Sequence, residues 1–358
     1  DAAALFRMGD QKQAAAAAML AQLYFNAEAY IGEDHFDECA TICQDIIDGE
    51  YGYYELDDDW FGPHDFYNNE SPEIIWSTPS EFNKLQYNWF YADFYHYETY
   101  KYFGLDGGAN NGAHLQPSRK PTGEIYTEFK LGKPFEKFDN EDLRKKPYIY
   151  RGAGKYEGMF LVGRQESPYG ITRGTQEYKG EVIYFVDRVA RFKKIGIEAP
   201  DTASLSSTMA DGEENTGIRW VKVPQPNLAD ENLRNGADNP VIRLAEIYYM
   251  LAECKMRAGD KRTAANLINQ VRARNFANRE DPNPVTADNL DKYRMIDEWG
   301  IEFLGEGRRR TDLIRWNMFV TESWWDHKPS NSTHLCRFPV PQQAISGNNA
   351  LQQNPGYE

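Results

Sequence analysis

The sequence predicts a mainly α-helical protein in which helical hairpins carry a long, loop-rich and partly β insertion. Two segments with helical periodicity, residues 11–48 and 241–274, match each other without gaps. The segment between them is rich in Gly, Pro, Asn and Tyr, and only short runs in it alternate like strands. With 358 residues and 41% hydrophobic content, the chain is long enough to bury a large core.

The first predicted hairpin starts with an Ala-rich helix that runs to about Ile31 and is broken at residues 32–34. A second helix follows through Ile47 and stops at Gly49. Its apolar residues recur at i, i+4, i+7 and i+11, which places them on one face of the helix. This predicted stripe consists of Phe36, Ala40, Cys43 and Ile47.

The second predicted hairpin, residues 241–274, repeats this plan with a break at residues 259–260. In the gapless match, small and apolar residues coincide, pairing Ala27 with Ala252, Ala40 with Ala265, Cys43 with Ile268, and Ile46 with Val271. Small residues at fixed places let helices approach closely, as in tetratricopeptide-type units, which stack because one alone cannot bury its face. We therefore expect superimposable hairpins in which all four alanines are buried.

Further helices are expected at about residues 286–305 and 308–319, and strands in EVIYFV and IRWVKV. These elements suggest three segments. Residues 1–79 form the first helical repeat with a short strand, residues 80–240 the insertion, and residues 241–358 the later repeats and tail. The first and last segments should pack as one unit. Long irregular segments on a helical scaffold often hold binding sites, so we expect the ligand site in the insertion.

Composition excludes several classes of protein. The net charge of −15 and the pI near 5.0 disfavour nucleic acid, whose binding requires clustered Lys and Arg. The sequence contains no run of eighteen or more apolar residues, which is the length that a membrane-spanning helix needs. The chain opens inside an Ala-rich helical pattern, which suggests that a preceding segment was removed, together with any targeting signal.

The sequence favours a protein without enzymatic activity, cofactor or metal. It lacks the motifs G-x-S-x-G, H-E-x-x-H, G-x-x-x-x-G-K and G-x-G-x-x-G. Because His35, Cys39 and Cys43 are spaced by four residues on one helix, they could hold zinc, but Cys43 already belongs to the apolar stripe and no fourth ligand is evident. The acidic run ELDDDWFG lacks the spacing of a calcium loop. Its carboxylates are expected to cap a turn.

The strongest indication of function from the residues themselves is an aromatic cluster within residues 87–102. Nine of these sixteen residues are Tyr, Trp or Phe, and the whole chain has 23 Tyr and 8 Trp. Sugars stack their C–H faces on such rings, while nearby Asn and Asp side chains bind the hydroxyls. About half of the rings should belong to the core. The predicted ligand-binding residues are Trp89, Tyr87, Tyr95, Tyr91, Tyr100, Asn88, Asn83 and Asp93.

A dense run of charges begins near the end of the predicted helix at residues 286–305 and continues beyond it. It consists of Glu302, Glu306, Arg308, Arg309, Asp312 and Arg315. Such a run could suggest an acid/base or phosphate site. Carboxylates and guanidiniums one helical turn apart more commonly form structural ion pairs, so we assign the run to folding.

Four blocks in the C-terminal third resemble, in order and spacing, the signature blocks of the SusD/RagB family. They are DNPVIRLAEIYYMLAE, AANLINQVRAR, DEWGIEFLGEGRRRTDLIRW and RFPVPQQAISGNNALQQNPGY. AAAAAMLAQLYF, DIIDGEYGYYEL and SPEIIWS extend the resemblance to nearly the whole chain. The chain departs from the family at Trp299, where Arg is usual, so packing should replace one ion pair. The resemblance also implies an additional N-terminal region with a lipidated Cys, which we expect to lie outside these 358 residues.

The resemblance implies a SusD-like fold on a surface-exposed outer-membrane lipoprotein whose anchor lies outside this chain. It further implies a protein that binds an oligosaccharide or polysaccharide and delivers it to a SusC-like, TonB-dependent transporter. A peptide ligand, as in some members of the same family, is an alternative. Glycoside hydrolysis and a purely structural scaffold for protein partners are the alternatives from other classes.

Overall fold

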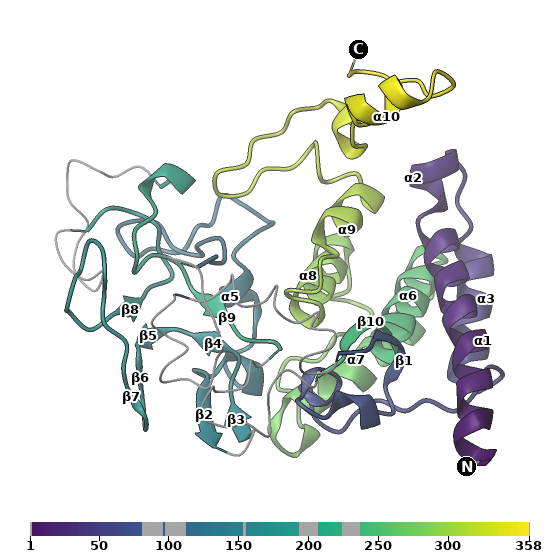
Figure 1. Cartoon of the computed structure of the whole chain (residues 1–358), viewed down its shortest axis with the longest axis horizontal. Coiled ribbons are helices and arrows are strands. Elements are labelled where there is room, and N and C mark those ends of the chain that lie inside the picture. The colour runs from purple at the N-terminus through teal and green to yellow at the C-terminus, as the bar shows by residue number, and fades with distance from the viewer. Residues whose placement is uncertain are drawn as a thin grey trace.

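The computed structural model describes residues 2–80, 96, 112–152, 155–192, 207–223 and 237–357, with side chains described from residue 13 onward. Figure 1 shows the helices gathered on one side of the molecule and the short strands of the insertion on the other. The C-terminal segment, with the short helix α10 (Gln342–Gly347), extends past the end of α9.

Two helical hairpins form the scaffold, as predicted. The first contains α1 (Ala2–Phe25), α2 (Ala27–Ile31) and α3 (Phe36–Ile47), and the second contains α6 (Leu244–Arg257) and α7 (Lys261–Arg272). The helices α3 and α7 are both 12 residues long and begin at positions that the predicted alignment pairs. Helix α3 of the first hairpin packs on α6 of the second, so the two repeats stack directly.

The start of the second hairpin differs from the prediction. Val241 and its two successors are not helical but belong to strand β10 (Asn239–Arg243), which pairs antiparallel with β1 (Ile74–Thr78). The β-branched Val241 and Ile242 suit a strand. Because β1 and β10 flank the insertion, their pairing brings the two ends of the insertion together at the scaffold.

The predicted single helix up to Ile31 is also interrupted, at Asn26. The side-chain amide of this residue donates to the Gln22 backbone oxygen at 2.9 Å, and its amide oxygen accepts from Arg315 at 3.2 Å. Asn side chains compete with the backbone for hydrogen bonds, which disfavours a continuous helix. Helix α2 then ends at Gly32, whose φ of 81° lies in the left-handed region that glycine adopts without strain.

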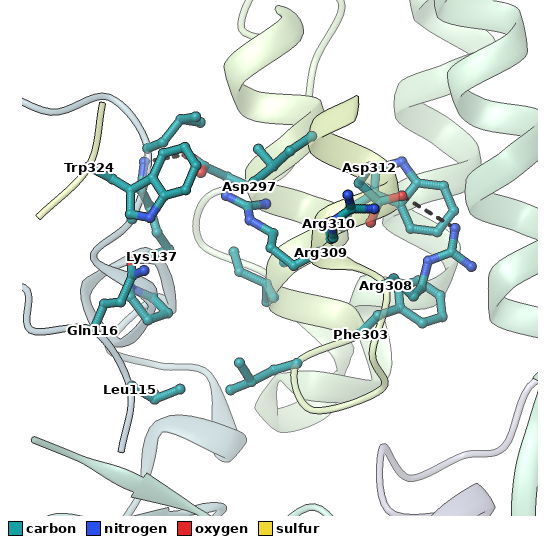
Figure 2. Close-up of a pocket in the computed structure, with 18 of the residues that line it drawn as sticks. Leu115, Gln116, Lys137, Asp297, Phe303, Arg308, Arg309, Arg310, Asp312 and Trp324 are labelled. Carbon is teal, nitrogen blue, oxygen red and sulfur yellow. Dashed lines mark hydrogen bonds and ion pairs between the residues drawn. The ribbon is translucent and has the colours of Figure 1, made fainter. Parts of the chain in front are cut away.

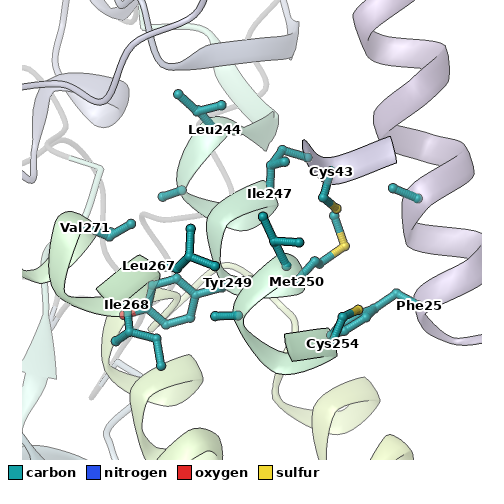
Figure 3. Packing of buried hydrophobic residues seen from close by; sticks show 14 of the residues in the cluster. Phe25, Cys43, Leu244, Ile247, Tyr249, Met250, Cys254, Leu267, Ile268 and Val271 are labelled. Carbon is teal, nitrogen blue, oxygen red and sulfur yellow. The ribbon is translucent and has the colours of Figure 1, made fainter. Parts of the chain in front are cut away.

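Burial confirms the repeat at three of its four predicted alanines. Ala27, Ala252 and Ala265 are buried, whereas Ala40 is only half-buried. The centre of the buried stripe on α3 is formed by Cys39, Cys43 and Ile46. The predicted apolar face is therefore rotated by about one residue from the buried face, since Ala40 and Ile47 were predicted where Cys39 and Ile46 are buried. Periodicity alone did not show which side of the helix faces α6. Figure 3 shows Cys43 directed toward Ile247 and Met250 of α6.

The insertion contains only short strands. The structure describes β2 (Ile149–Gly152), β3 (Lys155–Glu157), β4 (Phe160–Leu161), β5 (Gly163–Arg164), β6 (Glu166–Ser167), β7 (Gly170–Ile171), β8 (Tyr184–Phe185) and β9 (Arg219–Trp220). They pair β2–β3, β4–β9, β5–β8 and β6–β7. The predicted strands in EVIYFV and IRWVKV are confirmed as β8 and β9. Phe138, Tyr148, Phe160 and Phe185 are among the fully buried residues of a core separate from that of the hairpins.

The third predicted helix pair exists, but both helices are shorter than expected. Helix α8 spans Lys292–Glu302 and α9 spans Arg309–Arg315. The Asp291 carboxylate accepts a hydrogen bond from the Arg294 amide at 2.8 Å and so caps the start of α8. Helix α5 (Pro134–Lys137) of the insertion packs against α8.

The charged run forms largely buried ion pairs, but most of its partners lie far away in the sequence. The buried Glu302 carboxylate accepts from Arg144 at 2.8 Å, Arg243 at 2.9 Å and Arg274 at 3.0 Å. Only the pairs of Asp312 with Arg308 and Arg315 follow the predicted one-turn spacing. Arg309 departs from the prediction, since it has no carboxylate within 4.0 Å among the described residues.

Trp299 replaces the expected ion pair with packing and one hydrogen bond. Its indole is almost fully buried, and its Nε1 donates to the Glu253 carboxylate at 2.8 Å. The same carboxylate pairs with Arg315 at 2.8 Å. Rings of Phe25, Tyr249 and Phe303 surround the indole.

We predict that Glu253 makes stability depend on pH in the acid range. Burial alone would raise the pKa of Glu253, but the charge of Arg315 and the hydrogen bonds from Arg315 and Trp299 lower this pKa from 4.5 to about 2. The resulting stabilisation is complete above pH 4.5 and is lost as the pH falls toward 2. In urea unfolding across this window, Glu253→Gln should flatten the slope of unfolding free energy against pH. The exposed control Glu280→Gln should keep it, and an unchanged slope in Glu253→Gln would contradict the assignment.

Candidate functional site

The eight predicted ligand-binding residues lie outside the described residues. They are Trp89, Tyr87, Tyr95, Tyr91, Tyr100, Asn88, Asn83 and Asp93. Within that stretch the structure describes His96, which is fully buried and lies with its Nε2 2.6 Å from the Glu214 carboxylate. Glu214 also accepts hydrogen bonds from the Thr175 amide and hydroxyl, both at 2.7 Å. His96 is therefore held by Glu214, which lies far from it in the sequence of the insertion.

A cavity of about 500 Å³ lies where the helical scaffold meets the insertion. Residues 114–116, which follow the aromatic stretch along the chain, form part of its lining. The lining is largely apolar and includes Leu115, Leu131, Pro134, Ile301, Leu304, Leu313, Phe319 and Trp324. Figure 2 shows Leu115, Gln116 and Trp324 on one side and Phe303 and Arg308 on the other.

Charged groups enter the cavity from both walls. Lys137 of α5 pairs with Asp297 of α8 and so ties the insertion to the scaffold. Arg309 lies between the two walls (Figure 2). One of its terminal nitrogens, Nη1, donates to the Ile296 backbone oxygen at 2.6 Å. Burial lowers the pKa of Arg309, and the charges of Asp297 and Asp312 offset only part of this effect. The guanidinium nevertheless stays protonated at neutral pH.

A second groove, of about 740 Å³, lies between the first hairpin and α9. Its apolar side includes Met19, Leu23 and Tyr30, which are 46%, 57% and 62% exposed. In the repeat alignment Met19 corresponds to Leu244, which is buried in α6. His64 lines the groove, and among the described residues neither ring nitrogen has a hydrogen-bond partner; the Glu306 carboxylate lies 3.7 Å from Nε2. Burial lowers the pKa of His64 to about 3, so this imidazole is neutral at physiological pH.

The residues considered for zinc belong to the core and its edge. The buried sulfurs of Cys39 and Cys43 lie 3.9 Å apart, and His35 Nδ1 lies 2.8 Å from the Glu38 carboxylate. In the parts of the chain that the structure describes, no three His, Cys, Asp or Glu side chains gather in a way that could hold a metal ion. Those parts also contain no helix with the length and hydropathy needed to cross a membrane.

Sequence reasoning missed the cavity and the groups that line it. Lys137, Asp297 and Trp324 come from separate elements and carry no shared motif. Arg309 was noticed, but only as one member of the charged run. Leu115 and Gln116, which line the cavity, follow the predicted aromatic cluster along the chain but carry no motif of their own.

The fold and the cavity define a class: a helical-hairpin scaffold bearing an irregular insertion, with a largely apolar cavity at their junction. Comparison with known proteins identifies the family within that class. The model of the SusD family matches residues 72–336, so the chain belongs to the SusD family. This result confirms the family and the mainly α, SusD-like fold predicted from the sequence.

Two curated relatives and several solved structures are similar to the chain. The starch-binding protein SusD of Bacteroides thetaiotaomicron is 36% identical over 128 residues, which are 34% of this chain and 22% of the relative. SusD-like protein P25 of Formosa agariphila is 30% identical over 135 residues, or 34% of this chain and 26% of the relative.

Among solved structures, NanU of Bacteroides fragilis has a TM-score of 0.58 at 16% identity, covering 97% of this chain and 63% of NanU. Surface glycan-binding protein A of B. thetaiotaomicron has a TM-score of 0.55 at 16% identity, covering 95% and 63% of the two chains. These likenesses show the fold. The matches span about a quarter of each curated relative and less than two thirds of each of these solved chains.

Proposed function

We propose that this protein binds an oligosaccharide or polysaccharide at the cell surface. The observation that carries the proposal is membership of the SusD family, in which a relative named for starch binding is 36% identical over 128 residues. A solved structure of the same fold is named a surface glycan-binding protein. The proposed role is binding without catalysis.

The proposed binding surface combines the aromatic stretch with the adjoining cavity. Tyr87, Trp89, Tyr91, Tyr95 and Tyr100 would stack on sugar rings, and Asn83, Asn88 and Asp93 would bind hydroxyls. Two observations support this placement. Residues 114–116, which follow the aromatic stretch along the chain, line the cavity, and His96 contacts Glu214 of the same insertion.

Delivery of the glycan to a SusC-like, TonB-dependent transporter completes the proposed role. The protein would act at the outer membrane as a lipoprotein, anchored by a segment outside residues 1–358. Purification of the tagged protein from detergent-solubilised outer membranes tests this part of the proposal. We expect a large β-barrel transporter to co-purify in a stable ratio, whereas recovery of the protein alone would count against the partnership.

Native affinity gels with a panel of polysaccharides test the binding function directly. We expect retardation by at least one glycan, with no release of reducing ends during prolonged incubation. Release of reducing ends would indicate a glycoside hydrolase. Retardation by no glycan, together with calorimetric binding of peptides, would favour the peptide-binding alternative in the same family.

Trp89→Ala should weaken binding of the best glycan about thirtyfold. Removing a stacked ring at a binding hot spot costs about 2 kcal/mol. Isothermal titration calorimetry and the thermal midpoint should be measured on the same preparation. The matched control is Tyr53→Ala, because Tyr53 is 82% exposed and lies outside the aromatic stretch. Unchanged affinity with a large loss of stability would instead place Trp89 in the core.

A further inference from the structure

Arg309 and Arg310 differ from the other described cations that line the cavity, because neither has a described carboxylate within 4.0 Å, and of these two only Arg310 also lies over aromatic rings. Arg308 pairs with Glu246, and Lys137 pairs with Asp297. Arg310 donates to the Leu335 backbone oxygen and lies over the Phe319 and Phe338 rings. Among the described residues, Arg309 has no carboxylate within 4.0 Å, and the bond to Ile296 is its one hydrogen bond.

The surroundings hold the Arg309 guanidinium in place. Its Nη1 is fixed by the Ile296 backbone oxygen, and a Cβ atom at Gly300 would lie only 3.0 Å from the same nitrogen. Glycine at position 300 therefore leaves room for the guanidinium against α8. A guanidinium has five N–H donors, so this arrangement leaves four for another acceptor.

The charge balance at this point of the cavity favours an anion. The two carboxylates whose charges act on Arg309 are already paired: Asp297 with Lys137, and Asp312 with Arg308 and Arg315. The charge of Arg309 is therefore not neutralised by a direct partner among the described residues. Beside apolar side chains such as Leu131 and Leu313, an unpaired charge is costly and attracts an opposite charge more strongly than in water.

We propose that Arg309 binds the carboxylate of an acidic sugar, so that the ligand is a carboxylate-bearing oligosaccharide. The planar guanidinium matches a carboxylate in a bidentate arrangement, and the apolar lining contacts the ring faces of the sugar. This inference rests on the proposed glycan-binding function and names the class of glycan. The net charge of −15 repels polyanions at long range, so sparsely charged acidic glycans fit better than densely sulfated ones.

A calorimetric panel of acidic oligosaccharides, each paired with its carboxyl-reduced form, tests the proposal. The probes are acidic glucuronoxylan oligomers and sialyllactose, in which few of the sugars carry a carboxylate. We expect at least one acidic member to bind and its reduced form to bind about thirtyfold more weakly, as for loss of a charged hydrogen-bonding partner. Binding of neutral glycans alone, or equal binding of both forms, overturns the acidic ligand and leaves glycan binding standing. Failure of all glycans, including neutral ones, removes the proposed function as well.

Substitutions at position 309 separate ligand binding from folding. Arg309→Met should weaken binding of the acidic oligosaccharide about thirtyfold and leave that of the reduced form unchanged. Arg309→Lys keeps the charge but loses the bidentate geometry, so we expect an intermediate affinity. Arg262→Met, at an exposed position on α7, is the matched control and should bind like the wild type. If Arg309→Met does not fold, two measurements still test whether Arg309 binds the ligand carboxylate. They are the affinity of Arg309→Lys and the affinities of the wild type for the acidic and the carboxyl-reduced oligosaccharide. Equal losses for both forms in either variant contradict the proposal.

Discussion

Glu302→Ala is expected to lower the free energy of unfolding by about 3–5 kcal/mol, because it removes one partner from a buried ion network. The Glu302 carboxylate lies between Arg144, Arg243 and Arg274 at 2.8–3.0 Å, and all four residues are buried. Burial alone would raise the pKa of Glu302, but the three arginines hold this pKa well below 4.5. Without the carboxylate, Arg144 would keep Asp142, and Arg243 and Arg274 would share Glu73, so the buried network would lose one negative charge and become more positive.

Chemical denaturation of Glu302→Ala and Glu302→Gln at neutral pH measures this effect. The glutamine keeps one hydrogen-bond acceptor but not the charge, so its loss should be smaller. Arg279→Ala is a suitable control because the Arg279–Asp58 pair is exposed, and such pairs contribute about 0–1 kcal/mol. A loss below about 1 kcal/mol in Glu302→Ala would show that the network is not a major source of stability.

This network also links stability to the proposed binding surface. Arg144 belongs to the insertion, Arg243 to β10 and Glu302 to α8, so one carboxylate joins insertion, sheet and helical scaffold. The cavity lies at the same junction. We infer that Glu302 positions the insertion relative to the scaffold as well as stabilising the fold.

As a separate single substitution, Trp299→Ala is expected to lower the free energy of unfolding by about 3–5 kcal/mol, because it creates a cavity in the hairpin core. Its indole is 1% exposed, and its centroid lies 5.1–5.8 Å from those of Phe25, Tyr249 and Phe303. The substitution also removes the indole donor to Glu253. Thermal and denaturant unfolding of the purified variant measure the loss.

Two further variants at position 299 separate packing from hydrogen bonding. Trp299→Phe keeps most of the ring contact but loses the Nε1 donor, so we expect a loss of about 1–3 kcal/mol. Trp299→Arg introduces the residue usual in the family beside Arg308, whose guanidinium lies 4.1 Å from the indole centroid. Repulsion between the two cations should destabilise this variant. The control Trp76→Ala removes an indole that is 41% exposed and should cost far less. Comparable losses in Trp76→Ala and Trp299→Ala would contradict the account.

Elements whose formation depends on nearby residues could be predicted from the sequence. Helices α3 and α7 appear where their apolar periodicity placed them, and α7 begins after the capping residue Asp260, whose carboxylate accepts from the Thr263 amide at 3.1 Å. The repeat of the two hairpins was visible because matching small residues recur at matching positions. Family membership followed from ordered blocks of sequence. The proposed aromatic site stays a prediction, since its residues lie outside those that the structure describes.

Features that depend on contacts between distant segments were decided only by the tertiary structure. Val241 lies in a strand because β1, far away in sequence, pairs with its two neighbours Pro240 and Ile242. Glu302 finds its arginines in three separate segments, and Arg309 lacks a carboxylate partner among the described residues although its sequence neighbours are charged. Local periodicity and capping depend on residues within a few positions of one another, so the sequence alone determined the helices and their repeat. Ion pairs and cavities depend on which side chains meet in space, and that required the folded chain.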